Sequence, residues 1–161
     1  MSESTDATLR RFNLLIGEWT TESTHPAVPD TVIHGKASFE WLEGERFLIW
    51  RESADHPDFP DAIAIIGDTD GFWVHSFDSR GVYRVMQTRI SDEAWEFDLS
   101  RDQPSDTAFA EGSPGFAGRF VGTFDDGGDT IDGRFQVSED DEHWRDDLMT
   151  TYRRVASSDA G

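Results

Sequence analysis

The sequence predicts an all-β fold, an up-and-down antiparallel β-barrel of about ten strands that follows a short N-terminal helix. Three observations support this prediction. Polar and apolar residues alternate through most of the chain after residue 17, as they do in half-buried strands. Short connections rich in Gly, Pro and Asp separate the alternating segments. Helical patterns do not recur between them, which argues against a parallel α/β sheet. The 161 residues suit a single domain, 1–161.

Residues 6–16 are expected to form the helix, because their apolar side chains recur at helical spacing. Asp6 can cap the start of this helix, and Gly17 is expected to end it. The apolar stripe contains Leu9, Phe12, Leu15 and Ile16.

The alternating segments that follow are expected to be strands at residues 18–24, 31–42, 45–54, 61–68, 72–78, 81–90, 93–100, 117–125, 129–138 and 143–154. Turns at 42–45, 69–71 and 126–129 contain the glycine that tight hairpins need. The longest irregular segment, 101–116, is expected to be a flexible loop. The small polar residues 156–161 are expected to form a frayed tail.

The alternation also assigns strand faces, and the aromatic faces are expected to line the barrel interior. Trp95 and Phe97 oppose Glu96 in the seventh strand, and Trp144 is expected to share the inner face of the last strand with Tyr152. A barrel of about ten strands is wider than the eight that side chains can just fill. The geometry therefore predicts an internal cavity.

Two similar segments, which begin at His25 and His56 and contain two prolines each, are expected to be loops. Proline fixes φ and removes a backbone donor, so neither segment can lie inside a sheet. Because alternate loops of an up-and-down sheet fall at the same end, both histidines are expected on one rim. The turn with Asp78 and Arg80 belongs to that rim, where the four side chains could bind a metal or an anion. An ordinary turn explains Asp78 and Arg80 equally well.

His75 alternates with Trp73 and Phe77 along the fifth strand. If this face points inward, His75 is a titratable group in an aromatic pocket. The alternative is a histidine with an ordinary hydrogen bond in the core or at the surface.

Arg84 lies on an otherwise apolar strand face between Val82 and Met86. An arginine that points into the barrel must be paired, because an isolated buried charge is costly. Its partner is either a carboxylate on a ligand or a buried carboxylate such as Glu52 or Asp146.

The formal net charge of −19 opposes binding to nucleic acid and to anionic membrane surfaces, so neither partner is expected. The acidic start of the chain does not resemble a signal peptide, and a cytoplasmic location is expected. The chain has no cysteine and no nucleophile, phosphate-loop or dinucleotide motif. The acidic clusters lack the ligand spacing of a calcium loop, so no metal site is predicted.

Several motifs occur together along nearly the whole chain. They are a Gly-x-Trp start at 17–19 and segments at 77–82, 118–124, 130–135, 143–147 and 151–154. As a set they resemble an uncharacterised bacterial family of lipocalin-like, calycin-type proteins. The resemblance implies a lipocalin-like barrel without an established activity. More distantly the chain is similar to the nitrobindins, barrels that bind haem through a histidine near the C-terminal strand.

The matching stretch of this chain, 147–152, has no histidine. His143 lies at the start of the last strand, and His75 would have to bind haem instead. No cofactor is therefore expected, and a haem-binding protein similar to nitrobindin is kept as an alternative.

The leading hypothesis is a barrel that binds a small apolar or amphipathic molecule in its interior. His75 and Arg84 are the expected anchors, with His25, His56, Asp78 and Arg80 at the rim. The expected wall residues are Trp50, Trp95 and Tyr152. One alternative is an enzyme that uses a cavity histidine as acid or base. Another is a scaffold or interaction protein with a filled barrel, and a homodimer is compatible with the sequence.

Overall fold

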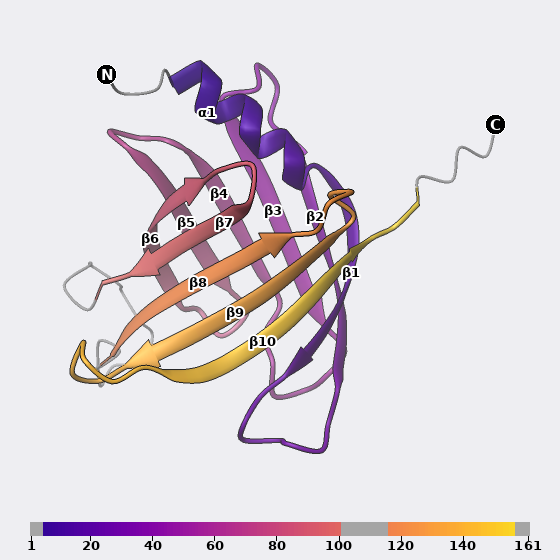
Figure 1. The fold of residues 1–161 in the computed structure, drawn as a ribbon, viewed down its shortest axis with the longest axis vertical. Helices are drawn as coiled ribbons and strands as arrows, with labels where there is room; N and C mark the ends of the chain where they lie inside the picture. The colour runs from indigo at the N-terminus through magenta and orange to yellow at the C-terminus, as the bar shows by residue number, and fades with distance from the viewer. Residues whose placement is uncertain (1–4, 101–115, 157–161) are drawn as a thin grey trace.

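The structure, a computed structural model, describes residues 5–100 and 116–156. Its strands form one closed antiparallel barrel in which each strand pairs with its neighbours in sequence and β1 pairs with β10 (Figure 1). The strands are β1 Gly17–Thr24, β2 Ile33–Trp41, β3 Phe47–Ala54, β4 Ala62–Asp68, β5 Phe72–Asp78, β6 Tyr83–Ile90, β7 Ala94–Leu99, β8 Ala117–Phe124, β9 Thr130–Ser138 and β10 Arg145–Arg154. The predicted fold class is confirmed, and each strand end lies within two residues of its expected position.

A short helix and a tighter turn cover one end of the barrel (Figure 1). The helix α1 spans Thr5–Arg11 and continues as a 3₁₀ helix, Phe12–Leu15. The predicted helix over 6–16 is therefore divided into two forms. In a 3₁₀ helix residues three apart eclipse each other, so Phe12 and Leu15 can both point into the barrel. Both are buried, with exposed fractions of 1% and 0%.

The helix α1 and the 3₁₀ helix together form a plug at this end of the barrel. Arg154, at the end of β10, binds this plug to the barrel wall. Its Nη2 donates to the backbone oxygen of Leu14 at 2.9 Å, and its guanidinium lies 4.2 Å from the ring centre of Trp19. Gly17 passes close beneath it with a φ of 129°, and a Cβ there would lie 2.9 Å from Arg154 Nη1. The chain thus needs glycine at position 17, where the plug ends and β1 begins.

The barrel half next to the helix is packed solid. Its inward side chains have almost no accessible surface, and they interlock through edge-on and stacked rings. Trp95 is central to this packing, with ring centres of Phe39 and Phe120 at 5.7 and 5.3 Å. The fully buried members include Phe12, Leu15, Trp19, Phe39, Leu48, Ile66, Val74, Trp95 and Ile131.

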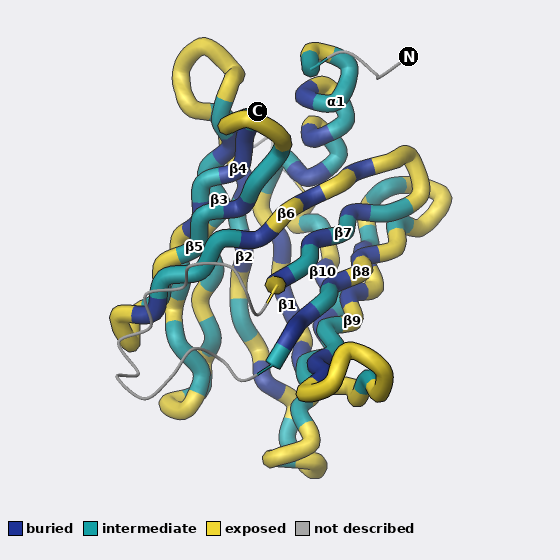
Figure 2. Tube along the Cα trace, turned by 90° about the vertical axis from the view of Figure 1, so that its left-hand side faces the viewer, coloured by how far each residue is buried: buried dark blue, intermediate teal, exposed yellow. Residues whose placement is uncertain are grey.

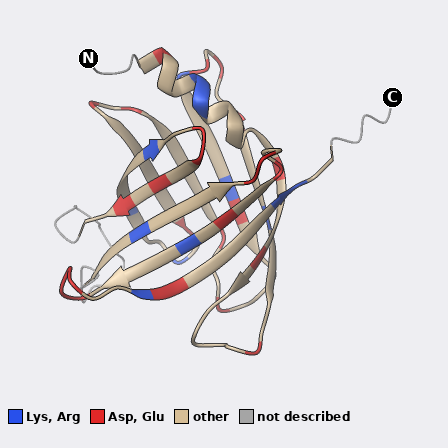
Figure 3. Ribbon diagram, in the orientation of Figure 1, with Lys and Arg blue, Asp and Glu red and all other residues tan. Residues whose placement is uncertain are grey.

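Exposed and buried residues alternate along the strands, and the turns are exposed (Figure 2). Acidic residues gather in the turns at both ends, and acidic and basic residues both occur along the strands (Figure 3). In residues 5–100 and 116–156, no helix has the length and hydropathy that crossing a bilayer requires. The segments expected to be a flexible loop (101–116) and a frayed tail (156–161) lie outside the described residues, apart from Phe116 and Ala156.

The last strand contains a β-bulge that the alternation did not predict. The register shifts between Asp146 and Leu148, which leaves Asp147 as the extra residue. The bulge changes the phase of the strand before Leu148. Trp144 therefore does not share the inner face with Tyr152. It lies on the outer wall, where the guanidinium of Arg119 is 4.1 Å from its ring centre.

Candidate functional site

In the barrel half opposite the helix, a group of inward residues retains accessible surface, whereas others in the same half, such as Ile33, Leu99 and Val137, are buried. This open half is built mainly from β3, β4, β5 and β6, together with the bulged end of β10. The inward residues Trp50, Glu52, Ala54, Ala62, Ser76, Arg84 and Leu148 are all only partly buried. The side chains of Ala54, Ala62 and Ser76 are small. The interior is therefore filled at one end and accessible at the other.

Glu52 places a carboxyl group inside this open half. Its β3 neighbours on the same face are Leu48 and Trp50, and its partners across the sheet are Ala37 and Ala62. The alternation that made Trp50 a wall residue therefore carries Glu52 inward as well. Sequence reasoning considered Glu52 only as a partner for Arg84, although the 48–50–52 pattern could have identified it.

The Glu52 carboxylate accepts a long hydrogen bond from the Tyr152 hydroxyl, which lies 3.5 Å from each carboxylate oxygen. The Trp50 indole N–H approaches the same carboxylate, but it has no hydrogen-bond partner of good geometry. Burial raises the pKa of Glu52 from 4.5 to about 7, although Tyr152 and Trp50 act to lower it. Burial and the nearby carboxylate raise the pKa of Tyr152 well above its ordinary value. Glu52 therefore exchanges its proton near neutral pH.

Arg84 also points into the open half, as the sequence predicted. It pairs with Ser76 across the sheet and shares its face with the buried Val82 and Met86. Its Nε is buried and has no hydrogen-bond partner. Burial, helped by the charge of Arg80, lowers the pKa of this guanidinium.

The loops at the open end meet around an aromatic side chain, Phe59. The ring centre of Phe59 lies 5.8 Å from that of His25 and 5.2 Å from that of His56. His25 Nε2 lies 3.0 Å from Oδ1 of Asp147, the extra residue of the β-bulge. The two histidine loops therefore share one rim and contact each other. Phe59 and Asp147 were not identified as rim residues from the sequence, because neither has a motif.

The turn between β5 and β6 lies at the same rim. Asp78 pairs with Arg80 at 2.7 Å and accepts its backbone N–H at 2.9 Å. Although burial opposes the shift, Arg80 lowers the pKa of Asp78. The Ser79 N–H donates to the Asp61 backbone oxygen at 2.8 Å, which joins this turn to the His56 loop. Asp78 and Arg80 thus satisfy each other, as in an ordinary turn.

His75 does not line the interior. Its neighbour Val74 is 0% exposed in the core, so the pleat directs His75 to the outer wall together with Trp73 and Phe77. There His75 Nδ1 lies 3.1 Å from the hydroxyl of Tyr83. The prediction that His75 is an inward anchor is therefore wrong. The strand β5 is apolar on both faces, and the face with Val74 packs into the core.

Trp95 is also corrected as a wall residue of an accessible cavity. It is 0% exposed, and its Nε1 donates to Thr88 Oγ1 at 3.0 Å. Trp50 packs edge-on against it with ring centres 5.1 Å apart. Trp50 therefore forms the floor of the open half, and Trp95 supports that floor from within the packed half.

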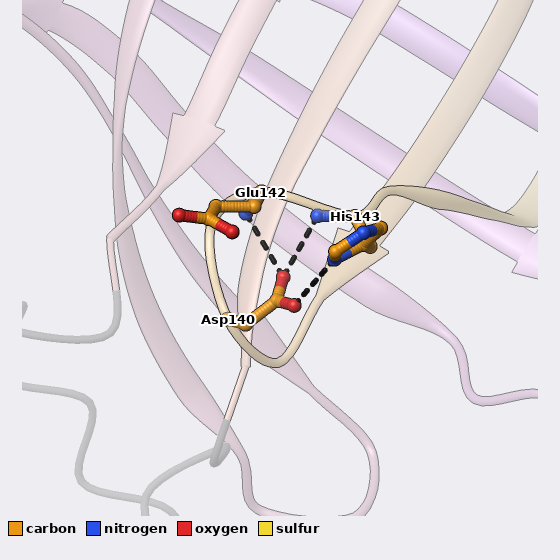
Figure 4. A group of neighbouring side chains, drawn as sticks. All are labelled: Asp140, Glu142 and His143. Atoms are coloured by element: carbon orange, nitrogen blue, oxygen red, sulfur yellow. Dashed lines mark hydrogen bonds and ion pairs between the residues drawn. The ribbon is translucent and has the colours of Figure 1, made fainter.

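Asp140, Glu142 and His143 cluster in the exposed turn between β9 and β10 (Figure 4). Asp140 accepts backbone N–H groups from Glu142 at 2.9 Å and from His143 at 2.7 Å, and its other oxygen lies 2.6 Å from His143 Nδ1. These hydrogen bonds lower the pKa of Asp140. The cluster is a self-satisfied turn, and its arrangement is explained without a cation.

Open grooves of about 910 and 930 Å³ lie on the outer wall. The first is lined mainly by outward residues of β1 to β5, including the exposed Ile63 and Phe77. The second lies over β6 to β10 and is bordered by charged residues such as Arg89 and Asp98. Neither groove contains Arg84, and the first also touches Glu52 and Ala62 of the open half.

No family model matches this chain, and no curated protein matches it. The crystal structure of Rv2717c from M. tuberculosis is similar, with a TM-score of 0.68 and 15% sequence identity over 92% of this chain and 98% of that one. The structure of EF1p2_mFAP2b bound to DFHBI has a TM-score of 0.41 and 12% identity, over 92% of this chain and 99% of that one. The likeness to Rv2717c supports the barrel fold.

Proposed function

We propose that the open half of the barrel binds a small, mostly apolar molecule, in the manner of lipocalin-like proteins, and that the ligand enters at the His25 and His56 rim. The observation that carries this proposal is the contrast between the two halves. Folded proteins pack their interiors densely. Accessible inward surface beside Trp50, together with buried polar atoms that lack partners, is therefore typical of a binding site.

The chemistry of the open half fits such a ligand. The Trp50 ring offers an apolar floor, and the small side chains of Ala54 and Ala62 leave space above it. The Arg84 Nε is a buried donor without a partner, and the Trp50 indole N–H has only the Glu52 carboxylate nearby, without a hydrogen bond of good geometry. A buried donor without a partner costs free energy, and an acceptor on a ligand would offset that cost.

The structure does not favour two of the other functions considered from the sequence, an acid–base enzyme and a haem protein. An acid–base enzyme built on His75 lacks its histidine, because His75 lies on the outer wall. Haem does not fit the described residues either. No described histidine lies inside the open half, because His75 and the exposed His34 are on the outer wall, His25 and His56 are at the rim, and His143 is in the exposed turn.

Filling the open half tests the proposal. Ala62→Phe adds an aromatic ring beside Glu52, whereas Ser53→Phe adds the same ring on the outward face of the neighbouring strand. We expect Ala62→Phe to fold with a free energy of unfolding within about 1.5 kcal/mol of the parent, because the ring enters existing space. Binding of the uncharged fluorescent probe N-phenyl-1-naphthylamine should fall at least about tenfold in Ala62→Phe and remain unchanged in Ser53→Phe.

Equal probe binding by both variants and the parent would place the probe outside the barrel and refute interior binding. A loss of several kcal/mol of stability in Ala62→Phe would show that the open half is already filled.

A further inference from the structure

Arg84 stands out among the arginines of the described chain. Most other arginines pair with carboxylates, as Arg46 does with Asp6 at 3.0 Å and Arg89 with Asp98 at 2.7 Å, while Arg119 donates a hydrogen bond to Gln136 and Arg10 is exposed to solvent. The sequence holds 33 acidic residues and only 14 Lys and Arg, so carboxylate partners are abundant. Arg84 nevertheless makes no hydrogen bond and no salt bridge in the described parts of the chain, and its Nε is buried.

The charged groups nearest to Arg84 do not satisfy it. Asp78 and Asp147 attract its charge over longer distances, and Arg80 repels it. Asp78 is already paired with Arg80 at 2.7 Å, and Asp147 with His25 at 3.0 Å. Both rim carboxylates are thus held by other partners, and the guanidinium stays directed into the interior.

The surroundings of Arg84 on the inner wall are apolar or small. Met86 follows it on the same face, Ser76 lies opposite, and the ring centre of Phe116 is 6.0 Å from its guanidinium carbon. A planar guanidinium presents a fork of donors that matches the two oxygens of an acid group. An apolar wall next to such a fork suits a molecule with an apolar body and one acidic end.

Building on the proposed function, we propose that the ligand is an amphipathic organic acid, and that Arg84 binds its carboxylate while Trp50 and the small inward residues hold its apolar body. The negative net charge of the protein does not attract such an anion. Selection for the acid therefore rests on this guanidinium inside the barrel. Keeping an unpaired charge there costs stability, which a binding role explains.

Matched competitors test the ligand class. Decanoate and decanol have the same apolar length and differ in the acidic group. Each is titrated against bound N-phenyl-1-naphthylamine at pH 6.5. For the parent protein we expect decanoate to displace the probe at about tenfold lower concentration than decanol.

Two variants that each remove one positive charge locate the effect. Arg84→Gln should bind decanoate and decanol equally. Arg89→Gln, on the outer face of the same strand, should keep the parent's preference for decanoate. Arg84→Gln is expected to fold at least as stably as the parent, since it removes a charge that has no partner. Should it fail to fold, Arg84→Lys retains a charge without the fork and is expected to show a reduced preference.

The outcomes separate this inference from the proposed function. If the probe binds and Ala62→Phe blocks it, but decanoate shows no advantage or keeps its advantage in Arg84→Gln, the interior binds a ligand and the acid assignment is overturned. If the probe binds Ala62→Phe as well as the parent, the proposed function itself fails.

Discussion

Glu52 shows how a single residue can link the interior of this barrel to pH. Its carboxyl group is surrounded by the barrel wall, yet part of the residue remains accessible from the open half. Burial disfavours the ionised form, and the Tyr152 hydroxyl only partly offsets that penalty. Glu52 is therefore protonated to a substantial extent at neutral pH. A neutral carboxyl group beside Trp50 is compatible with a mostly apolar ligand, whereas an ionised one is not.

The raised pKa of Glu52 predicts a stability difference with a defined sign. The folded protein holds this proton more tightly than the unfolded chain, so the contribution of Glu52 is fully present below pH 4.5. That contribution is lost as pH rises through about 7. Relative to the parent, Glu52→Gln should gain free energy of unfolding between pH 5 and 8, by up to about 3 kcal/mol. Urea unfolding at a series of pH values measures this difference.

Glu43→Gln, in an exposed turn, is the control and should show no such gain. A Glu52→Gln difference that stays constant from pH 4 to 8 would mean that Glu52 titrates as an exposed carboxyl group does.

The same carboxyl group predicts pH-dependent binding. Above about pH 7 Glu52 is ionised and repels a second negative charge in the open half. Decanoate should therefore bind the parent more weakly at pH 8.5 than at pH 6, whereas Glu52→Gln should bind it equally at both values. Displacement of N-phenyl-1-naphthylamine measures both affinities, and decanol serves as the uncharged control. Equal pH dependence in the parent and in Glu52→Gln would assign the effect to another group.

Single residues also show where prediction from the sequence was limited. The inward direction of Arg84 could be predicted, because one polar residue stood on an apolar face. The direction of His75 could not, because Trp73 and Phe77 on its own face are as apolar as Val74 on the other. Only the packing of the whole core decides which face turns inward. The Asp147 contact with His25 joins residues far apart in sequence and has no local signal.

At the scale of elements, alternation and turn chemistry were sufficient to predict every strand. A shift of one residue would turn the apolar face of a strand toward solvent, so the pattern of apolar residues has to be clear in each strand. The end of the helix was less accurate. The choice between α and 3₁₀ winding depends on how Phe12 and Leu15 fit into the barrel. The bulge in β10 was missed for a similar reason, because it is defined by pairing with β9.

The plug formed by α1 and the following 3₁₀ helix predicts a strong effect of truncation. Phe12 is 1% exposed and packs against Phe72 with ring centres 5.8 Å apart. Phe12→Ala should lower the free energy of unfolding by about 3–5 kcal/mol, since it removes a large buried ring and leaves a cavity. Denaturant unfolding followed by tryptophan fluorescence measures the loss. Arg10→Ala, at an exposed position of α1, should change stability by less than about 0.5 kcal/mol.

A loss of less than about 1 kcal/mol in Phe12→Ala would show that the helix merely rests on the barrel end. The packed half would then be stable without its plug.

At the scale of the whole molecule, the two barrel ends perform different tasks. One end is closed by α1 and filled with aromatic rings and aliphatic side chains. The other end retains inward surface, a carboxyl group and an unpaired guanidinium. If the proposed function holds, stability and recognition are assigned to opposite halves of one sheet.

A crystal structure of the protein grown with decanoate tests this division most directly. We predict ligand density in the open half, with the carboxylate on the Arg84 guanidinium, the alkyl chain against Trp50 and the packed half unchanged. An open half filled by side chains, with decanoate bound only in the outer grooves, would contradict the account.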